Sequence, residues 1–531
     1  MDGGTAVLNQ FTQQVQLAKQ AYAQGKYEQA AGICDQLLLR LGMRDDLLNI
    51  KALSLLALGQ VEAAESSMRK ALKLNPRVAG MHLNAAGIYK ALSKNKLVKR
   101  HALEAVRLAP RQAVVLYQAA LLCRDCGDYP QALRIIDRCL QIQPDFSRAW
   151  HLKGSALTDL GKAEAAQAAM EKAVELEPGN VRALSTLINL RGDRLSDSKT
   201  VALLEHIRTT AASYPDRASA TFALANLYRR DGQYDLAFAN YLEANTLVAA
   251  SRPFDIAAWE QKATRTMETS ATPGTLDSSK EGSGANLVFI VGMPRSGTSL
   301  CEQVLSANSH VLACGELATM EHIDSSFARR GIDPYQSDPS QPQFEQAAAL
   351  YLSALPKNHR KFQVVTDKAP MNFERVGLIH QVFPQARFLY CIRHPLDTIL
   401  SCFMQDFQAG LLFAHNLEQI TRVYIAHAQL MKYWMKLLPG RIYVVKYEQY
   451  IEDQEAETRG VAEFLQLDFQ QGMLTPHLQE RAVVTASNLQ VRQAVYRSSI
   501  GRWKNYQVQL AGVISLLQKE GLLDADLNSL L

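Results

Sequence analysis

The chain has 531 residues, of which 47% are hydrophobic and 21% charged, and these values are typical of globular proteins with buried cores. This length predicts two or three domains. The formal charge is only +5, from 57 basic and 52 acidic residues, which argues against a dedicated nucleic-acid-binding protein. The eight cysteines are scattered, and the C-x-x-C at Cys123 and Cys126 lacks the second pair or nearby histidines of a zinc site. We therefore expect reduced thiols and no metal site.

The N-terminal sequence MDGGTAVLNQFTQQ has no basic segment followed by an apolar core, unlike a secretory signal. Further along, no apolar run has the length that spans a bilayer. We expect a cytoplasmic protein with no membrane and no nucleic-acid partner. The sequence does not indicate its oligomeric state.

The first third of the chain is internally repetitive, with a constant step of 34 residues. The repeated positions are Pro76, Pro110, Pro144 and Pro178; Gly25, Gly59, Ser93, Gly127 and Gly161; and Ala30, Ala64, Val98, Ala132 and Ala166. A proline ends a helix, a glycine permits a tight turn, and a small residue lets paired helices approach closely. Residues 10–180 therefore resemble an array of tetratricopeptide repeats, and residues 222–247 resemble a further unit of it.

The resemblance implies an α-solenoid over residues 1–265, in which stacked helix pairs share one core. Such an array either supports its neighbour or binds a peptide or protein in its concave groove, and the sequence leaves both roles open. The small and polar residues at 266–285 predict a linker, which leaves residues 286–531 as a second domain.

That second domain alternates short apolar runs with helical segments. The apolar runs, at 286–292, 362–368, 387–393 and 441–447, are expected to be strands. Alternating strands and helices predict an α/β domain with a parallel sheet. Ligands of such sheets bind at the carboxyl ends of the strands, so residues at those ends are the candidates for a site.

The stretch VFIVGMPRSGTS at 288–299 resembles the phosphate-binding P-loop, except that Thr298 stands where the lysine should be. Backbone N–H groups at the start of the following helix can bind a phosphate, and Arg295 adds a planar fork of donors. The segment IRHPLDTILS places Arg393 at another strand end and Ser401 in the next helix, where they can hold a second phosphate. The missing lysine and the lack of an evident magnesium ligand point away from ATP.

With these two motifs, residues 286–503 resemble the sulfotransferases that use 3′-phosphoadenosine 5′-phosphosulfate (PAPS), most of all the tyrosylprotein group. The whole chain then resembles bacterial proteins that join tetratricopeptide repeats to such a domain. The resemblance implies a 5′-phosphosulfate site at Arg295, Ser296, Gly297, Thr298 and Ser299, and a 3′-phosphate site at Arg393 and Ser401. It further implies a general base at Glu316, catalytic roles for Arg295, Lys368 and Ser487, and cofactor contacts from Tyr447 and Arg502.

The chain departs from the tyrosylprotein group at Gln405 and Arg502, where that group has an arginine and a lysine, and Arg492 is a candidate to offset the lost charge. His310 and His394 lie near the two motifs and are alternative bases, although we prefer Glu316.

The predicted function is transfer of the sulfonate of PAPS to a hydroxyl, most plausibly of a peptide tyrosine that the repeats dock. A saccharide or small-molecule acceptor is one alternative, and an inactive nucleotide-binding scaffold is another.

Overall fold

The computed structural model describes residues 2–192, 198–269, 284–337, 342–407, 410–479, 492 and 497–531. By compactness the chain divides into two units, Met1–Ala156 and Leu157–Leu531. This division does not coincide with the linker expected at 266–285. Helix α15 (Ile256–Thr269) includes the first four residues of that range, and residues 270–283 lie outside the described part. The boundary at 266–285 therefore stays a prediction from the sequence.

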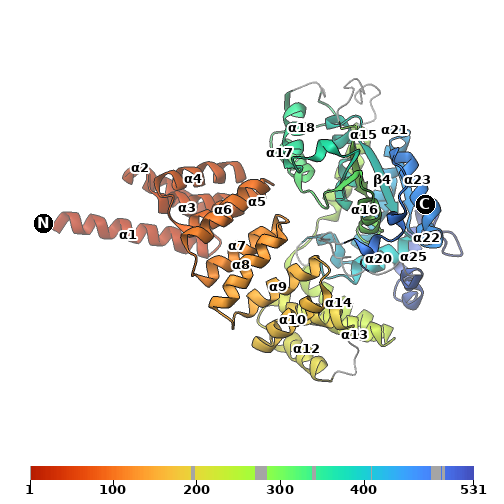
Figure 1. Ribbon diagram of the computed structural model, residues 1–531, viewed down its shortest axis with the longest axis horizontal. Helices are drawn as coiled ribbons and strands as arrows, with labels where there is room; N and C mark the ends of the chain where they lie inside the picture. Colours follow the sequence, from red (N-terminus) through yellow and green to blue (C-terminus); the bar gives the residue numbers. More distant parts are fainter. Residues whose placement is uncertain are drawn as a thin grey trace. The chain divides into compact units, whose positions relative to one another are not determined.

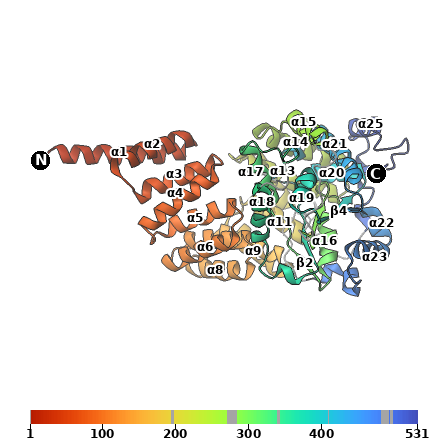
Figure 2. The same ribbon diagram turned by 90° about the horizontal axis from the view of Figure 1, so that it is seen from above.

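The N-terminal half of the chain is a series of helices, and Figures 1 and 2 show the helix pairs of the first unit stacked in chain order. These are α1 (Asp2–Ala23), α2 (Tyr27–Leu41), α3 (Asp45–Ala57), α4 (Val61–Leu74), α5 (Ala79–Ala91), α6 (Asn95–Leu108), α7 (Ala113–Asp125), α8 (Tyr129–Ile142) and α9 (Ser147–Asp159). The second unit continues with α10 (Ala163–Leu176), α11 (Val181–Arg191), α12 (Ser198–Thr210), α13 (Tyr214–Arg230), α14 (Tyr234–Ser251) and α15.

The repeated residues have the roles that their types predict. The five turn residues all have positive φ, from +55° at Ser93 to +80° at Gly127, and each turn separates the two helices of a pair. The small residues from Ala30 to Ala166 are at most 2% exposed, because they lie where the helices of a pair meet. The prolines follow the ends of α4, α6, α8 and α10. The predicted helix-pair repeat is confirmed.

The C-terminal half contains a five-stranded sheet in which all pairs are parallel, as predicted. Its strands are β1 (Leu287–Val291), β2 (Val311–Ala313), β3 (Val364–Asp367), β4 (Arg387–Ile392) and β5 (Ile442–Lys446), in the order β2-β3-β1-β4-β5. Strand β2 was not expected from the sequence, because its three residues are too short to show a periodicity. Strands β3 and β2 lie on one side of β1, and β4 and β5 lie on the other, so the direction in which strands are added reverses at β1. Ligands of open α/β sheets bind at such a point.

Side chains of successive strand residues face opposite layers of helices. Val288 and Ile290 of β1 pack toward α16 (Thr298–Ser306), α22 (Tyr447–Glu452) and α23 (Gln454–Leu465). Phe289 and Val291 belong to the core on the other face. The helices of that core and around it are α17 (Thr319–Arg329), α18 (Pro342–Ala354), α19 (Val376–Val382), α20 (Pro395–Phe403), α21 (Leu417–Leu437) and α25 (Ala511–Lys519). This is a three-layer α/β fold, and 3-10 turns such as η7 (Arg502–Tyr506) connect its elements.

The last repeat-like helix pair, α13 and α14, shares its core with the sheet. The side chain of Asn245 on α14 is fully buried and donates from Nδ2 to the carbonyl oxygen of Phe403 at 2.8 Å. Its Oδ1 lies 2.9 Å from Nδ1 of His415, so the amide joins two segments of the α/β fold. Tyr241, one turn earlier, is also fully buried in that core. The final repeat unit is thus a structural part of the α/β fold.

Candidate functional site

The loop between β1 and α16 is held in a conformation that needs glycine at two positions. Gly292 has φ +147°, and a Cβ there would lie 2.3 Å from the carbonyl oxygen of Cys391 on β4. Gly297 has φ +102°, and a Cβ there would lie 2.9 Å from Cδ2 of Tyr447. Between them Arg295 has φ +71°, which is uncommon for a residue with a side chain. The loop therefore lies tightly against β4 and α22 and ends at the first turn of α16, whose N–H groups favour an anion.

The two predicted phosphate motifs lie together. Nε of Arg295 donates to Oγ of Ser401 on α20 at 3.1 Å. Nη1 of Arg393, which follows β4, donates to the carbonyl oxygen of Arg295 at 3.3 Å. The Arg393 guanidinium also lies over the ring of Tyr447, 5.0 Å from its centroid. Two cationic side chains, a hydroxyl and a helix start thus meet at the carboxyl ends of β1 and β4.

The predicted base and lysine form an ion pair at the carboxyl ends of β2 and β3. Nζ of Lys368 donates to Oε1 of Glu316 at 2.5 Å. The lysine side chain is only 1% exposed, whereas the glutamate is 48% exposed. Two residues after the lysine, the carbonyl oxygen of Pro370 accepts the N–H of Gly292 at 3.1 Å. The pair is therefore tied to the start of the phosphate loop, with its carboxylate open to an incoming molecule.

Two buried polar atoms test whether the site fits an anionic cofactor. Oγ of Ser296 and Nε of Arg393 are buried and have no hydrogen-bond partner within the described residues. A buried donor without a partner costs about 1–3 kcal/mol, so such atoms are expected where a ligand completes the site. Both belong to the predicted phosphate motifs. The residues present fit a ligand with two phosphate groups.

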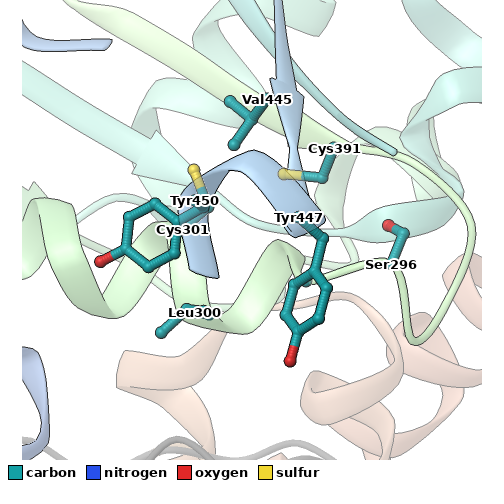
Figure 3. Close-up of a pocket in the computed structure, with 8 residues that line it drawn as sticks. Ser296, Leu300, Cys301, Cys391, Val445, Tyr447 and Tyr450 are labelled. Carbon is teal, nitrogen blue, oxygen red and sulfur yellow. The ribbon is translucent and has the colours of Figure 1, made fainter. Parts of the chain in front are cut away.

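A small hollow lies directly beside the loop. Figure 3 shows its walls, which come from Leu300 and Cys301 of α16, from Cys391 and Val445 of β4 and β5, and from Tyr447 and Tyr450 of α22. Ser296 and Gly297 of the loop border it. The hollow is mostly apolar apart from these loop residues and the tyrosine hydroxyls, and it has room for about one water molecule.

Residues near the C-terminus contact the second predicted phosphate motif. The carbonyl oxygen of Ser499 accepts from Nη2 of Arg393 at 2.5 Å, and its Oγ lies 2.7 Å from the hydroxyl of Tyr447. Arg502 is partly buried at the start of η7, three residues further on. Ser487 lies outside the described residues, so its predicted role is untested. Arg492 contacts another part of the unit, where its Nη2 donates to the carbonyl oxygen of Asp159 at 2.6 Å.

The alternative bases differ from Glu316 in their surroundings. His310 is exposed at the start of β2, and in a parallel sheet this is the edge opposite the phosphate loop. His394 stacks on Trp503, with ring centroids 5.4 Å apart. Its Nε2 lies 2.9 Å from the carbonyl oxygen of Leu527, which can only accept, so Nε2 carries the proton.

Two buried acids that hold the site together were not expected from the sequence. Asp397 on α20 accepts the N–H groups of Gly501 at 2.7 Å and Trp503 at 3.1 Å, and it lies 3.9 Å from Arg393. It therefore fixes the chain around Arg502 next to the second phosphate motif. Glu302 lies on the buried side of α16 and contacts the β2 and β3 ends. A charged residue at a core-facing helix position was the signal that would have revealed it.

A third buried acid, Asp367, directly precedes Lys368. Its Oδ2 accepts from the hydroxyl of Tyr351 at 2.8 Å, and its Oδ1 accepts the N–H of Leu317 at 3.5 Å. Burial raises the pKa of Asp367 from 3.8 to about 7, because the folded interior disfavours the charged carboxylate. Asp367 therefore links β3 to the residue after Glu316 and changes charge near neutral pH.

The described residues lack two further features. They contain no group of three or more histidine, cysteine, aspartate or glutamate side chains that could hold a metal ion. Their helices also include none that combines the length and the apolar character needed to cross a bilayer.

Parts of the chain are similar to known proteins. Residues 287–471 match the model of the sulfotransferase family, and residues 45–78 and 147–180 match that of the tetratricopeptide repeat. A protein of Aquifex aeolicus is 32% identical over 378 residues, which cover 68% of this chain and 49% of that protein. The chain thus spans about half the length of this relative.

A Caenorhabditis briggsae protein named "Putative protein-tyrosine sulfotransferase" is 24% identical over 193 residues, covering 36% of this chain and 69% of that protein. Among solved structures, the sulfotransferase domain of the Synechococcus PCC 7002 olefin synthase aligns with a TM-score of 0.32 and 18% identity, over 44% of this chain and 96% of that one. The tetratricopeptide-repeat protein TTC0263 of Thermus thermophilus aligns with a TM-score of 0.28 and 20% identity, over 37% of this chain and 99% of that one. From the family models, the chain carries a sulfotransferase-family domain in its C-terminal half, preceded by tetratricopeptide repeats.

Proposed function

We propose that this protein transfers the sulfonate group of PAPS to an acceptor hydroxyl. The observation that carries the proposal is the meeting of Arg295, Ser401 and Arg393, with two buried donor atoms left for a ligand. PAPS has a phosphate at each end of its nucleoside, and the two motifs supply one site for each.

PAPS supplies an activated sulfonate, whose bond to the 5′-phosphate breaks as the bond from sulfur to the acceptor oxygen forms. Glu316 accepts the proton of the acceptor hydroxyl through its exposed carboxylate. Lys368 and Arg295 stabilise the negative charge that develops on the oxygens of the moving and departing groups. Arg393 and Ser401 hold the 3′-phosphate and so keep the nucleotide in place.

The present contact between Lys368 and Glu316 has a chemical meaning in this scheme. The buried ammonium has the half-exposed carboxylate as its counterion, so the group proposed to accept the proton lies beside the group proposed to stabilise charge. When a sulfonate lies beside Lys368, the ammonium can donate hydrogen bonds both to the sulfonate oxygens and to Glu316. The proposed proton acceptor, Glu316, and the proposed charge-stabilising group, Lys368, thus lie together at one edge of the sheet.

We propose tyrosine of a peptide or protein as the acceptor and the repeats as its docking surface. The support is the resemblance of the site to the tyrosylprotein group and the similarity to the Caenorhabditis briggsae protein. The side chain of Glu316 is half exposed, so a large acceptor such as a peptide can reach its carboxylate. We place the reaction in the cytoplasm, because the eight free cysteines fit a reducing compartment.

The test is incubation of the full-length protein with sulfur-labelled PAPS and a panel of tyrosine peptides, saccharides and small phenols. We expect label on the tyrosine peptides. Label on saccharides alone would refute the tyrosine acceptor. Binding of the desulfated product, 3′-phosphoadenosine 5′-phosphate (PAP), without transfer to any acceptor would refute the enzyme and support a nucleotide-binding scaffold.

The base assignment is tested with Glu316→Gln. We expect kcat to fall about 100-fold or more, since the amide cannot accept the proton, while the Kd for PAP changes little. The matched control is Glu345→Gln, an exposed position on α18 that should leave kcat unchanged. Full activity of Glu316→Gln would show that another group is the base.

A further inference from the structure

Glu302 is a buried carboxylate in the helix that follows the phosphate loop. It is 3% exposed and lies on the side of α16 that faces the sheet. One of its oxygens, Oε1, accepts two hydrogen bonds from different segments. The backbone N–H of Gly315 donates at 2.9 Å, and the hydroxyl of Thr366 donates at 3.0 Å.

Each donor lies close in the chain to a residue of the proposed reaction. Gly315 directly precedes Glu316, and Thr366 lies two residues before Lys368. The same two segments are joined to each other, because the carbonyl oxygen of Gly315 accepts the N–H of Lys368 at 2.8 Å. Glu302 is therefore the point at which α16 meets both segments.

We propose that Glu302 is a positioning residue, which fixes the Glu316–Lys368 pair relative to the phosphate loop. The inference rests on the proposed function for its kinetic consequences but not for its structural ones. The loop leads directly into the short helix α16, which contains Glu302. The hydrogen bonds of the Glu302 carboxylate therefore hold the Glu316–Lys368 pair at a fixed position relative to the loop. Without this carboxylate, the chain after β2 keeps its contacts to β3 but loses the hydrogen bond from Gly315 to α16.

The chemistry of the buried carboxylate supports a specific role. A carboxylate costs free energy to bury, and it is found in a core where its oxygens bind particular donors. A hydrogen bond from a neutral donor to a charged acceptor is about twice as strong as one between neutral groups. A misplacement of about 1 Å at a reacting group can lower the rate about 100-fold. A strong anchor at this point thus affects turnover rather than nucleotide binding.

The kinetic test uses Glu302→Ala, which removes the acceptor, and Glu302→Gln, which keeps an oxygen at the same place. We expect Glu302→Ala to lower kcat about 30-fold or more while the Kd for PAP stays within about threefold. Glu302→Gln should keep kcat within about fivefold of the wild type. Thr366→Val removes one of the two donors, and its effect should be largely lost in the Glu302→Ala background.

A second readout needs neither PAPS nor activity. Hydrogen exchange, followed by mass spectrometry on the full-length protein without ligand, measures the protection of the Gly315 amide in a peptide that covers 312–317. Glu302→Ala should speed exchange there at least tenfold, and Glu302→Gln should change it much less. A melting curve identifies any variant that is unfolded, in which case Glu302→Gln and Thr366→Val carry the test.

The outcomes separate this inference from the proposed function. If the wild type transfers no sulfonate, the proposed function fails, while the exchange experiment still tests the anchor. Unchanged exchange in Glu302→Ala, or a kcat within threefold of the wild type, would overturn the positioning role. A Kd for PAP that rises as much as kcat falls would place Glu302 in nucleotide binding instead.

Discussion

Asp367→Asn tests whether a buried carboxyl beside Lys368 is neutral in the folded protein. Burial raises the pKa of Asp367 from 3.8 to about 7. Below pH 3.8 the carboxyl is protonated in both the folded and the unfolded chain, so it adds no dependence on pH. Between 3.8 and about 7 the unfolded chain releases the proton but the folded one keeps it. The free energy of unfolding therefore falls as pH rises through this window.

The size of the effect follows from the same two values. Each pH unit inside the window lowers the free energy of unfolding by about 1.4 kcal/mol, and the fall levels off above about pH 7. From pH 5 to pH 8 the wild type should lose about 2–3 kcal/mol from this group. Asparagine does not titrate, yet it can still accept the N–H of Leu317 and contact the hydroxyl of Tyr351. The variant should lack this loss.

The assay is urea unfolding at pH 5 and pH 8, followed by tryptophan fluorescence. Wild type and variant both carry Trp150→Phe, so that the signal comes from Trp259, Trp434 and Trp503 in the second unit. The stability of Asp367→Asn relative to wild type should rise by about 2–3 kcal/mol from pH 5 to pH 8. The exposed control Asp526→Asn should show no such change. A relative stability of Asp367→Asn that is the same at both pH values would refute the buried neutral carboxyl.

Two further predictions concern the loop and the repeats. Gly297→Ala should weaken PAP binding at least tenfold, as measured by calorimetry. The added Cβ would lie 2.9 Å from Tyr447, and alanine would be strained at the positive φ of this position. The control Gly512→Ala, whose Cβ would have no atom within 4 Å, should bind PAP normally. Unchanged binding would mean that the loop is not held as described. A chain of residues 145–531 should keep its fold and act on a small phenol, but it should show a higher KM for a protein acceptor. A chain of residues 266–531 should not fold, because it lacks α14 and the buried contacts of that helix. A stable, cooperatively melting 266–531 fragment would contradict the shared core.

The local parts of the candidate site are indicated by the sequence, because each depends on a few neighbouring residues. The phosphate loop needs a strand, two glycines at fixed spacing and a helix start, all within 288–299. Arg393 and Ser401 are likewise eight residues apart on one strand end and helix. The buried acids Glu302 and Asp397 escaped prediction, since a charged residue in a helix is usually exposed and only its contacts show otherwise. Their partners lie 13 to 106 residues away.

The sequence by itself determined the repeats and the parallel α/β domain, and it predicted the residues of the two phosphate motifs. Turn glycines, helix-ending prolines and small interior residues act locally, so a step of 34 residues is visible without any tertiary contact. Only the tertiary structure decided that Arg295 meets Ser401 across 106 residues and that Lys368 pairs with Glu316 across 52. It also decided that α14 belongs to the core of the α/β fold. The physical reason is that these contacts depend on how whole layers pack, and burial selects that packing through many weak interactions far apart in the chain.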